Sequence, residues 1–149
     1  GRYSDVHVRN DIVDFSMIID TFETSVTWDN LHDVHSNVRK LIKARPGTVC
    51  MTHSSHFYSA GTNLYFILIL KPQSPEEYFE FRSKILASII ENGGSPSHHH
   101  GTGELTGPLM EEHLGTTQMN VLRALKEHFD PHHIMNPGWT LGFDTKVRK

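Results

Sequence analysis

Three consecutive histidines, His98, His99 and His100, stand in the segment "GGSPSHHHGTG". Imidazoles titrate near neutral pH, so such a cluster can donate and accept protons at a polar reaction centre. If the segment is extended, His98 and His100 share one face and could bind zinc. A zinc site needs a third protein ligand, however, and no spacing in the sequence nominates one. Solvated or core histidines in a Gly-rich loop are the third interpretation.

Other candidate residues are more isolated. Tyr65 interrupts the aliphatic run "LYFILIL" and is by default a core aromatic with a satisfied hydroxyl. Arg9 precedes the first predicted strand and is either solvated or a clamp for a phosphate or carboxylate. His53 and His56 fall on opposite faces of a predicted strand, and structural roles are favoured for both. No phosphate loop, dinucleotide glycine motif or serine or cysteine nucleophile motif is present.

Length and composition indicate one compact domain rather than a nucleic-acid or membrane protein. A chain of 149 residues can bury a real core, and the net charge of −3 offers no basic field for nucleic acid or anionic lipid. The apolar run from Leu64 to Leu70 is too short to cross a bilayer. The single cysteine, Cys50, excludes an internal disulfide framework and fits a reducing compartment, so we expect a cytoplasmic protein.

The pattern of apolar and turn-forming residues predicts an α+β fold. Helical spacing in the first predicted helix begins at Trp28, with Thr27 as its N-cap, while Ser74 and Pro75 begin the second. The order β-α-β-β-α is most of a ferredoxin-like split βαβ unit, an antiparallel sheet with both helices on one face. The histidine segment stands where the fourth strand of that unit should be. The predicted strands cover residues 11–22, 48–59 and 62–71, and the predicted helices cover residues 28–44 and 75–92.

The character of the sequence changes after the histidine segment. Two predicted helices and a turn-rich tail with "HHIMNPG" follow. We therefore predict a ferredoxin-like cap or substrate domain over residues 1–103 and a C-terminal helical return segment over residues 104–149. Because the chain starts in polar sequence without a methionine and leads straight into a strand, we expect it to be a piece of a longer protein.

Four stretches occur in the order found in the C-terminal half of FAD-linked oxidases of the vanillyl-alcohol-oxidase type: "DTFETSVTWDNL", "YSAGTNLYFILIL", "IIENGGSPSHHHGTG" and "LKEHFDPHHIMNPG". The resemblance covers nearly the whole chain. The histidine triplet, "ETS...WD" and the pattern Y-x-A-G-x-x-x-Y from Tyr58 to Tyr65 are most similar to the alkyldihydroxyacetonephosphate synthases. D-lactate and glycolate dehydrogenases of the family carry a single histidine in this loop, and the "MNPG" tail looks more like theirs.

The resemblance implies roles for particular residues. Tyr65 and the triplet His98, His99 and His100 match catalytic positions, where a tyrosine exchanges a proton with the substrate carbon and the histidines move protons at the leaving and entering oxygens. Arg9 matches an arginine that grips the anionic end of the substrate. Asn136 in the "NPG" turn is expected near the flavin ring as a cofactor-binding residue. No metal is expected.

The resemblance also implies the wider setting. The intact parent would hold FAD in a separate FAD-binding domain of the same chain, and the present chain alone would hold none and be inactive. Its partners would be that domain and a small lipid or hydroxy-acid substrate, without nucleic acid, and a homodimer is a possible assembly. The location is then cytoplasmic or membrane-associated, or peroxisomal in a eukaryote.

Two other functions remain open. One is a flavin-dependent 2-hydroxy-acid dehydrogenase of the D-lactate or glycolate type, in which a histidine of the same loop acts as the base. The other is a non-enzymatic ferredoxin-like binding module that uses His98 and His100.

Overall fold

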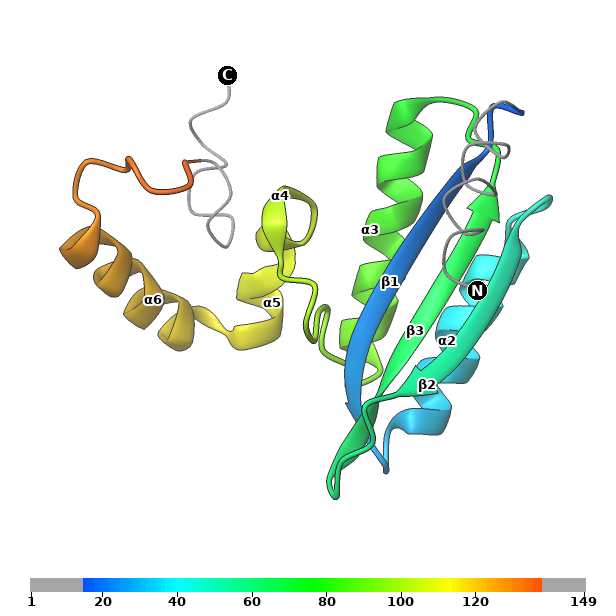
Figure 1. Cartoon of the computed structure of the whole chain (residues 1–149), viewed down its shortest axis with the longest axis horizontal. Helices are drawn as coiled ribbons and strands as arrows, with labels where there is room; N and C mark the ends of the chain where they lie inside the picture. The colour runs from blue at the N-terminus through cyan, green and yellow to red at the C-terminus, as the bar shows by residue number, and fades with distance from the viewer. Residues whose placement is uncertain (1–14, 138–149) are drawn as a thin grey trace, which may run out of the picture.

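A computed structural model describes residues 15–137, which form a three-stranded antiparallel sheet backed by two helices and followed by a helical segment (Figure 1). The α+β class predicted from the sequence is confirmed. The sheet and its helices comprise β1 (Ile18–Thr27), α2 (Leu31–Ala44), β2 (Val49–Ser55), β3 (Gly61–Leu70) and α3 (Pro75–Glu91). The segment that follows comprises α4 (Gly103–Thr106), the 3₁₀ turn η1 (Gly107–Leu109), α5 (Met110–Leu114) and α6 (Thr116–Phe129).

The strand order is β1-β3-β2, and both neighbours of β3 run antiparallel to it. In this register Tyr65 of β3 lies opposite Glu23 of β1 on one side and His53 of β2 on the other. Because side chains alternate along a strand, these three residues point to the same face of the sheet. Glu23, Tyr65 and His53, which are far apart in the sequence, are thus neighbours across the three strands.

The other face of the sheet is covered by α2 and α3, which lie side by side behind the strands in Figure 1. Alternate residues of β3 from Leu64 to Leu70 are buried there, and Phe66 is fully inaccessible to solvent. Both helices therefore lie on one face, as predicted. The helical contributions to this core are Val34, Val38 and Ile42 from α2 and Ile85, Leu86 and Ile89 from α3. The face turned away from α2 and α3 is called the open face below.

α3 begins with the N-cap serine and first-turn proline that the sequence predicts. Ser74 Oγ accepts a hydrogen bond from the backbone N–H of Glu77 at 3.2 Å, and Pro75 occupies the first turn. The carboxylate of Glu77 in turn accepts from the N–H of Gln73 at 3.1 Å and pairs with Arg45 at 2.8 Å. Since Arg45 is the C-cap residue that follows α2, this contact ties the end of α2 to the start of α3.

The beginning of α2 differs from the prediction. β1 continues to Thr27 and α2 starts at Leu31, so Trp28 lies between them rather than in a buried helical stripe. Its side chain is 43% exposed and its ring stacks on Phe57, with centroids 6.2 Å apart. The indole N–H donates to the backbone carbonyl of Tyr58 at 3.2 Å. Trp28 therefore fixes the connection between β2 and β3, a role that helical periodicity could not indicate.

The connection between β2 and β3 is longer than predicted, because β2 is shorter than the predicted strand over residues 48–59. β2 ends at Ser55 because His56 adopts a positive φ of 54°, which breaks the extended backbone. β3 starts at Gly61, where an added Cβ would lie 2.1 Å from the carbonyl oxygen of Val26. A side chain at position 61 would therefore push the two strands apart.

The C-terminal segment joins the main core through Leu109, which packs partly buried against it. After α6 the chain turns around Asp130, whose carboxylate accepts from the N–H groups of Ile134 and Met135 and pairs with Lys126. This ion pair and these hydrogen bonds lower the pKa of Asp130 to about 2. None of the helices within residues 15–137 has the length and apolar character to cross a membrane. The boundary between residues 103 and 104 stays a prediction.

Candidate active site

The histidine triplet is organised by a buried carboxylate on β1. Glu23 is 4% exposed, and its Oε1 atom accepts the backbone N–H groups of His98, His99 and His100 at 2.5, 2.7 and 2.9 Å. The same oxygen accepts the hydroxyl of Ser97 at 2.9 Å. Four donors from one short segment thus converge on a single oxygen of Glu23.

The ionised state of Glu23 is favoured by these bonds. Burial acts to raise its pKa, but the backbone N–H groups of His100, His98 and His99 and the hydroxyl of Ser97 lower the pKa below its ordinary value. Since that ordinary value already lies near 4.5, the carboxylate is an anion at neutral pH. A fixed buried charge therefore lies directly beneath the triplet.

The extended conformation that would place His98 and His100 on one face is wrong. Successive N–H groups of an extended strand point to opposite sides, so three in a row cannot reach one acceptor. The segment instead forms a turn, and no fourth strand forms between residues 95 and 102. Its three rings pack in sequence, with centroids 5.1 Å apart for His98 and His99 and 4.5 Å apart for His99 and His100.

A chain of close polar contacts runs from Glu23 to Tyr58. His99 Nδ1 lies 3.3 Å from Glu23 Oε2, and His98 Nδ1 lies 2.9 Å from His99 Nδ1. His98 Nε2 is 3.1 Å from the hydroxyl of Tyr58. Because a hydrogen bond needs a proton between its two nitrogen atoms, at least one of the paired Nδ1 atoms is protonated. The chain can therefore hold and relay a proton.

Tyr65 lies on the open face beside this chain. Its ring stacks on His53 with centroids 4.9 Å apart and meets the edge of His100 at 5.4 Å. It is half-buried rather than part of the hydrophobic core. The structure thus brings together four residues that the sequence singled out, Tyr65 and the triplet, while their catalytic roles stay predictions.

Four members of the cluster, Glu23 among them, are not site residues that the sequence predicts. Asn63 donates its amide to Glu23 Oε2 at 3.0 Å, and Tyr58 closes the chain of polar contacts. His56, expected to face away from His53, has left the strand, and its ring lies 4.8 Å from that of His99. Glu23 is an acidic residue inside an otherwise uncharged strand segment, "TFETSV", and this is the feature that could have marked it as a site residue. Its partner His98 lies 75 residues away, so the local sequence does not indicate the contact.

His56 is also a candidate for the third metal ligand that the sequence could not nominate. The candidate ligand atoms of His56, His98 and His99 all lie within 4.8 Å of one another. Both ring nitrogens of His98 already have hydrogen-bond partners, namely His99 and Tyr58. These contacts suit a proton-sharing network, and the expected absence of a metal stays a prediction.

Asn136, one of the other two predicted site residues, is not brought to this cluster. Arg9 lies outside the described residues. Asn136 is exposed with a φ of 52°, and it belongs to the segment after α6, which stands apart from the sheet in Figure 1. A positive φ is the conformation that Asn tolerates better than most residues, so the residue suits this turn.

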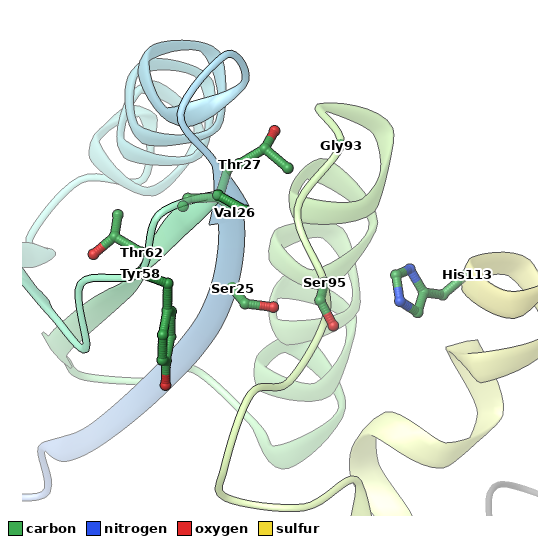
Figure 2. Close-up of a pocket in the computed structure, with 10 residues that line it drawn as sticks. Ser25, Val26, Thr27, Tyr58, Thr62, Gly93, Ser95 and His113 are labelled. Carbon is green, nitrogen blue, oxygen red and sulfur yellow. The ribbon is translucent and has the colours of Figure 1, made fainter.

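A pocket of about 400 Å³ adjoins the cluster at the end of the sheet where β1 meets the β2–β3 connection. Tyr58 lines it on one side and His113 of α5 on the other, with Ser25 and Ser95 between them (Figure 2). Burial lowers the pKa of His113, which favours its neutral form. Tyr58 therefore belongs both to the pocket and to the polar chain that leads to Glu23.

Comparisons with known proteins agree on one family. The sequence model described as "FAD linked oxidases, C-terminal domain" matches residues 4–140. The alkyldihydroxyacetonephosphate synthase of Dictyostelium discoideum is 33% identical over 145 residues, which cover 91% of this chain and 24% of that protein. A D-lactate dehydrogenase of Archaeoglobus fulgidus is 40% identical, but over 63 residues that cover 42% of this chain.

The structural comparison gives the same result. A solved structure of an alkyldihydroxyacetonephosphate synthase superposes with a TM-score of 0.59 at 27% identity, covering 91% of this chain and 22% of that one. The present chain therefore spans about a quarter of the length of the curated synthase from Dictyostelium discoideum.

Proposed function

This chain belongs to the family of FAD-linked oxidase C-terminal domains, and on that premise we propose that it is the cap and substrate domain of an alkyldihydroxyacetonephosphate synthase. The parent enzyme would exchange the acyl group of acyl-dihydroxyacetone phosphate for a fatty alcohol. The observation that carries the proposal is the turn anchored on Glu23, which presents three imidazoles beside Tyr65 on the open face.

The open face also suits a flavin ring. Beside the polar cluster, Val49 and Met51 of β2 are exposed and pair in register with half-buried Ile69 and Ile67 of β3. Such a flat apolar strip can cover one face of an aromatic ring system. When bound, FAD would supply the reactive ring against which the substrate carbon is held.

Different residues of this chain would then carry out different proton transfers. Tyr65 would exchange a proton with the substrate carbon, and the triplet would serve the leaving and entering oxygens. Arg9, from the resemblance, would pair with the substrate phosphate, since guanidinium and phosphate form strong charge-assisted hydrogen bonds. These steps need proton-transfer groups at fixed positions, and the contacts of Glu23 support that arrangement for the triplet.

A flavin-dependent 2-hydroxy-acid dehydrogenase is the second candidate, because D-lactate dehydrogenases match the chain over a shorter stretch. The two functions are separated by assaying the full-length parent enzyme with two substrate sets. Turnover of acyl-dihydroxyacetone phosphate with a fatty alcohol is expected. Turnover of D-lactate with a dye acceptor instead would reject the synthase.

We expect the purified chain of residues 1–149 to be colourless. Its described part offers a surface for the flavin ring but no G-x-G-x-x-G motif at the start of a helix, which is how a dinucleotide pyrophosphate is commonly held. The measurement is the absorbance spectrum after gel filtration. Flavin absorbance in a one-to-one ratio with the protein would contradict the expectation.

We expect chelator treatment to leave the turnover of the parent enzyme intact. The proposed proton transfers use imidazole and phenol groups, and both nitrogens of His98 are engaged in hydrogen bonds. The measurement is turnover before and after treatment with EDTA, with zinc added back in a parallel sample. Activity that EDTA abolishes and zinc restores would replace the proton network by a zinc site at His56, His98 and His99.

A further inference from the structure

We propose that Tyr58 accepts the proton of the entering fatty alcohol and passes a proton to the His98–His99 pair. The buried carboxylate of Glu23 stabilises the positive charge that this pair then carries. The inference rests on the proposed function and adds a second tyrosine with a different task from Tyr65. Tyr65 would serve the substrate carbon, and Tyr58 the entering oxygen.

The two tyrosines differ in their contacts with the imidazoles. The hydroxyl of Tyr58 is 3.1 Å from His98 Nε2, whose other nitrogen is 2.9 Å from His99 Nδ1. Tyr65 meets His100 and His53 through ring contacts, and within residues 15–137 no hydrogen bond joins its hydroxyl to an imidazole. A proton taken up at Tyr58 therefore has a direct route into the histidines, whereas one at Tyr65 has none.

Glu23 stabilises positive charge on His98 and His99, where the proton route from Tyr58 ends. Its Oε2 atom lies 3.3 Å from His99 Nδ1 and 3.8 Å from His98 Nδ1, and its side chain is almost fully shielded from water. An anion at this distance in a poorly solvated site stabilises an imidazolium that forms beside it. A buried carboxylate behind a histidine base has the same effect in serine proteases. Glu23 is thus a positioning residue, acting through the histidines.

Tyr58 is also placed where an alcohol can reach it. Its side chain is 52% exposed, and it lines the pocket of about 400 Å³ shown in Figure 2. The pocket wall includes the small or apolar residues Val26, Ala60 and Gly61. Small-molecule sites are commonly clefts of this size, lined mainly by apolar groups with a few polar ones. The hydroxyl end of an alkyl chain in this pocket would lie against Tyr58.

The proton balance of the reaction sets the test. When the alcohol enters, its O–H bond breaks and its oxygen bonds to the substrate carbon. The bond between that carbon and the ester oxygen breaks, and the fatty acid leaves with the electron pair as a carboxylate. The alcohol proton passes to Tyr58 as the Tyr58 proton passes to His98, and the histidine pair later releases one proton to solvent. If a fatty acid anion replaces the leaving acyl group instead, there is no proton to remove. The second exchange should therefore depend far less on Tyr58.

The experiment compares these two exchanges in the full-length parent enzyme. Labelled fatty alcohol reports the first, and a labelled free fatty acid without alcohol reports the second. For Tyr58→Phe we expect the ratio of alcohol rate to fatty acid rate to fall about a hundredfold, the scale of losing a proton-transfer group. Glu23→Gln removes the anion but keeps the side-chain shape, and it should lower the same ratio at least about tenfold.

Tyr78→Phe is the matched control, because the Tyr78 hydroxyl bonds Asp20 on the side of the sheet covered by α3 and should not affect the ratio. A ratio for Tyr58→Phe equal to that of the control would overturn the inference, as would an equal fall of both exchanges. A wild-type enzyme that catalyses neither exchange would reject the proposed function itself. The two failures are therefore distinguishable.

Discussion

Tyr65→Phe and His100→Ala should each lower turnover of the full-length parent enzyme at least about a hundredfold, because each removes a group proposed to transfer protons at the reaction centre. Neither change should alter the fold much. Phe keeps the ring that stacks on His53, and His100 lies at the exposed end of the triplet. The measurement is steady-state turnover of acyl-dihydroxyacetone phosphate and fatty alcohol, with circular dichroism to verify folding.

His128→Ala is the control for the loss of an imidazole, since His128 is exposed on α6 and away from the open face. A variant with alanine at His98, His99 and His100 tests the triplet as a group. Turnover of that variant at the wild-type rate would remove both the acid–base and the metal interpretation of the site. A fold that survives while turnover disappears would support the proton-transfer role.

Phe66→Ala should lower the free energy of unfolding of the 149-residue chain by about 3–5 kcal/mol. Phe66 is among the largest fully buried side chains, and it lies on the central strand between Phe22 of β1 and Thr52 of β2. Its removal leaves a cavity beneath α2, where the ring of His35 is 6.3 Å away. Since small domains are stable by only about 5–15 kcal/mol, a large share of the stability would be lost.

Urea denaturation followed by circular dichroism measures this loss, with midpoints compared at equal slopes. Phe79→Ala is the matched control, because Phe79 lies on α3 and is about half exposed to solvent. That variant should lose less than about 1 kcal/mol. Equal losses for the two variants would contradict the assignment of Phe66 to the core.

The sequence alone determined the elements whose signals are local. Ser74 and Pro75 indicate the start of α3, because capping depends only on residues within one turn of the helix end. The apolar run from Leu64 to Leu70 indicated a central strand, and β3 is the middle strand of the sheet. Family motifs such as "SHHHG" indicated the functional loop without any knowledge of its conformation.

Errors arose where a long-range contact overrode the local pattern. Trp28 fits a helical stripe by spacing, but its ring packs on Phe57 from another connection. The alternating pattern places His56 in a strand, but its positive φ turns it toward the triplet. Local propensity is a weak guide wherever a tertiary contact contributes more free energy than the residue's own preference.

The conformation of the triplet was decided by tertiary structure alone. In isolation "SPSHHHG" is compatible with a strand, a loop or a metal-binding H-x-H pair. Glu23, contributed by a strand 75 residues earlier in the sequence, attracts the three consecutive N–H groups and selects the turn. A buried carboxylate must be fully hydrogen-bonded to remain ionised, and this requirement fixes the backbone of its partners as firmly as it fixes Glu23. The sequence therefore supplied the chemical groups, and the sheet register placed the charge that arranges them.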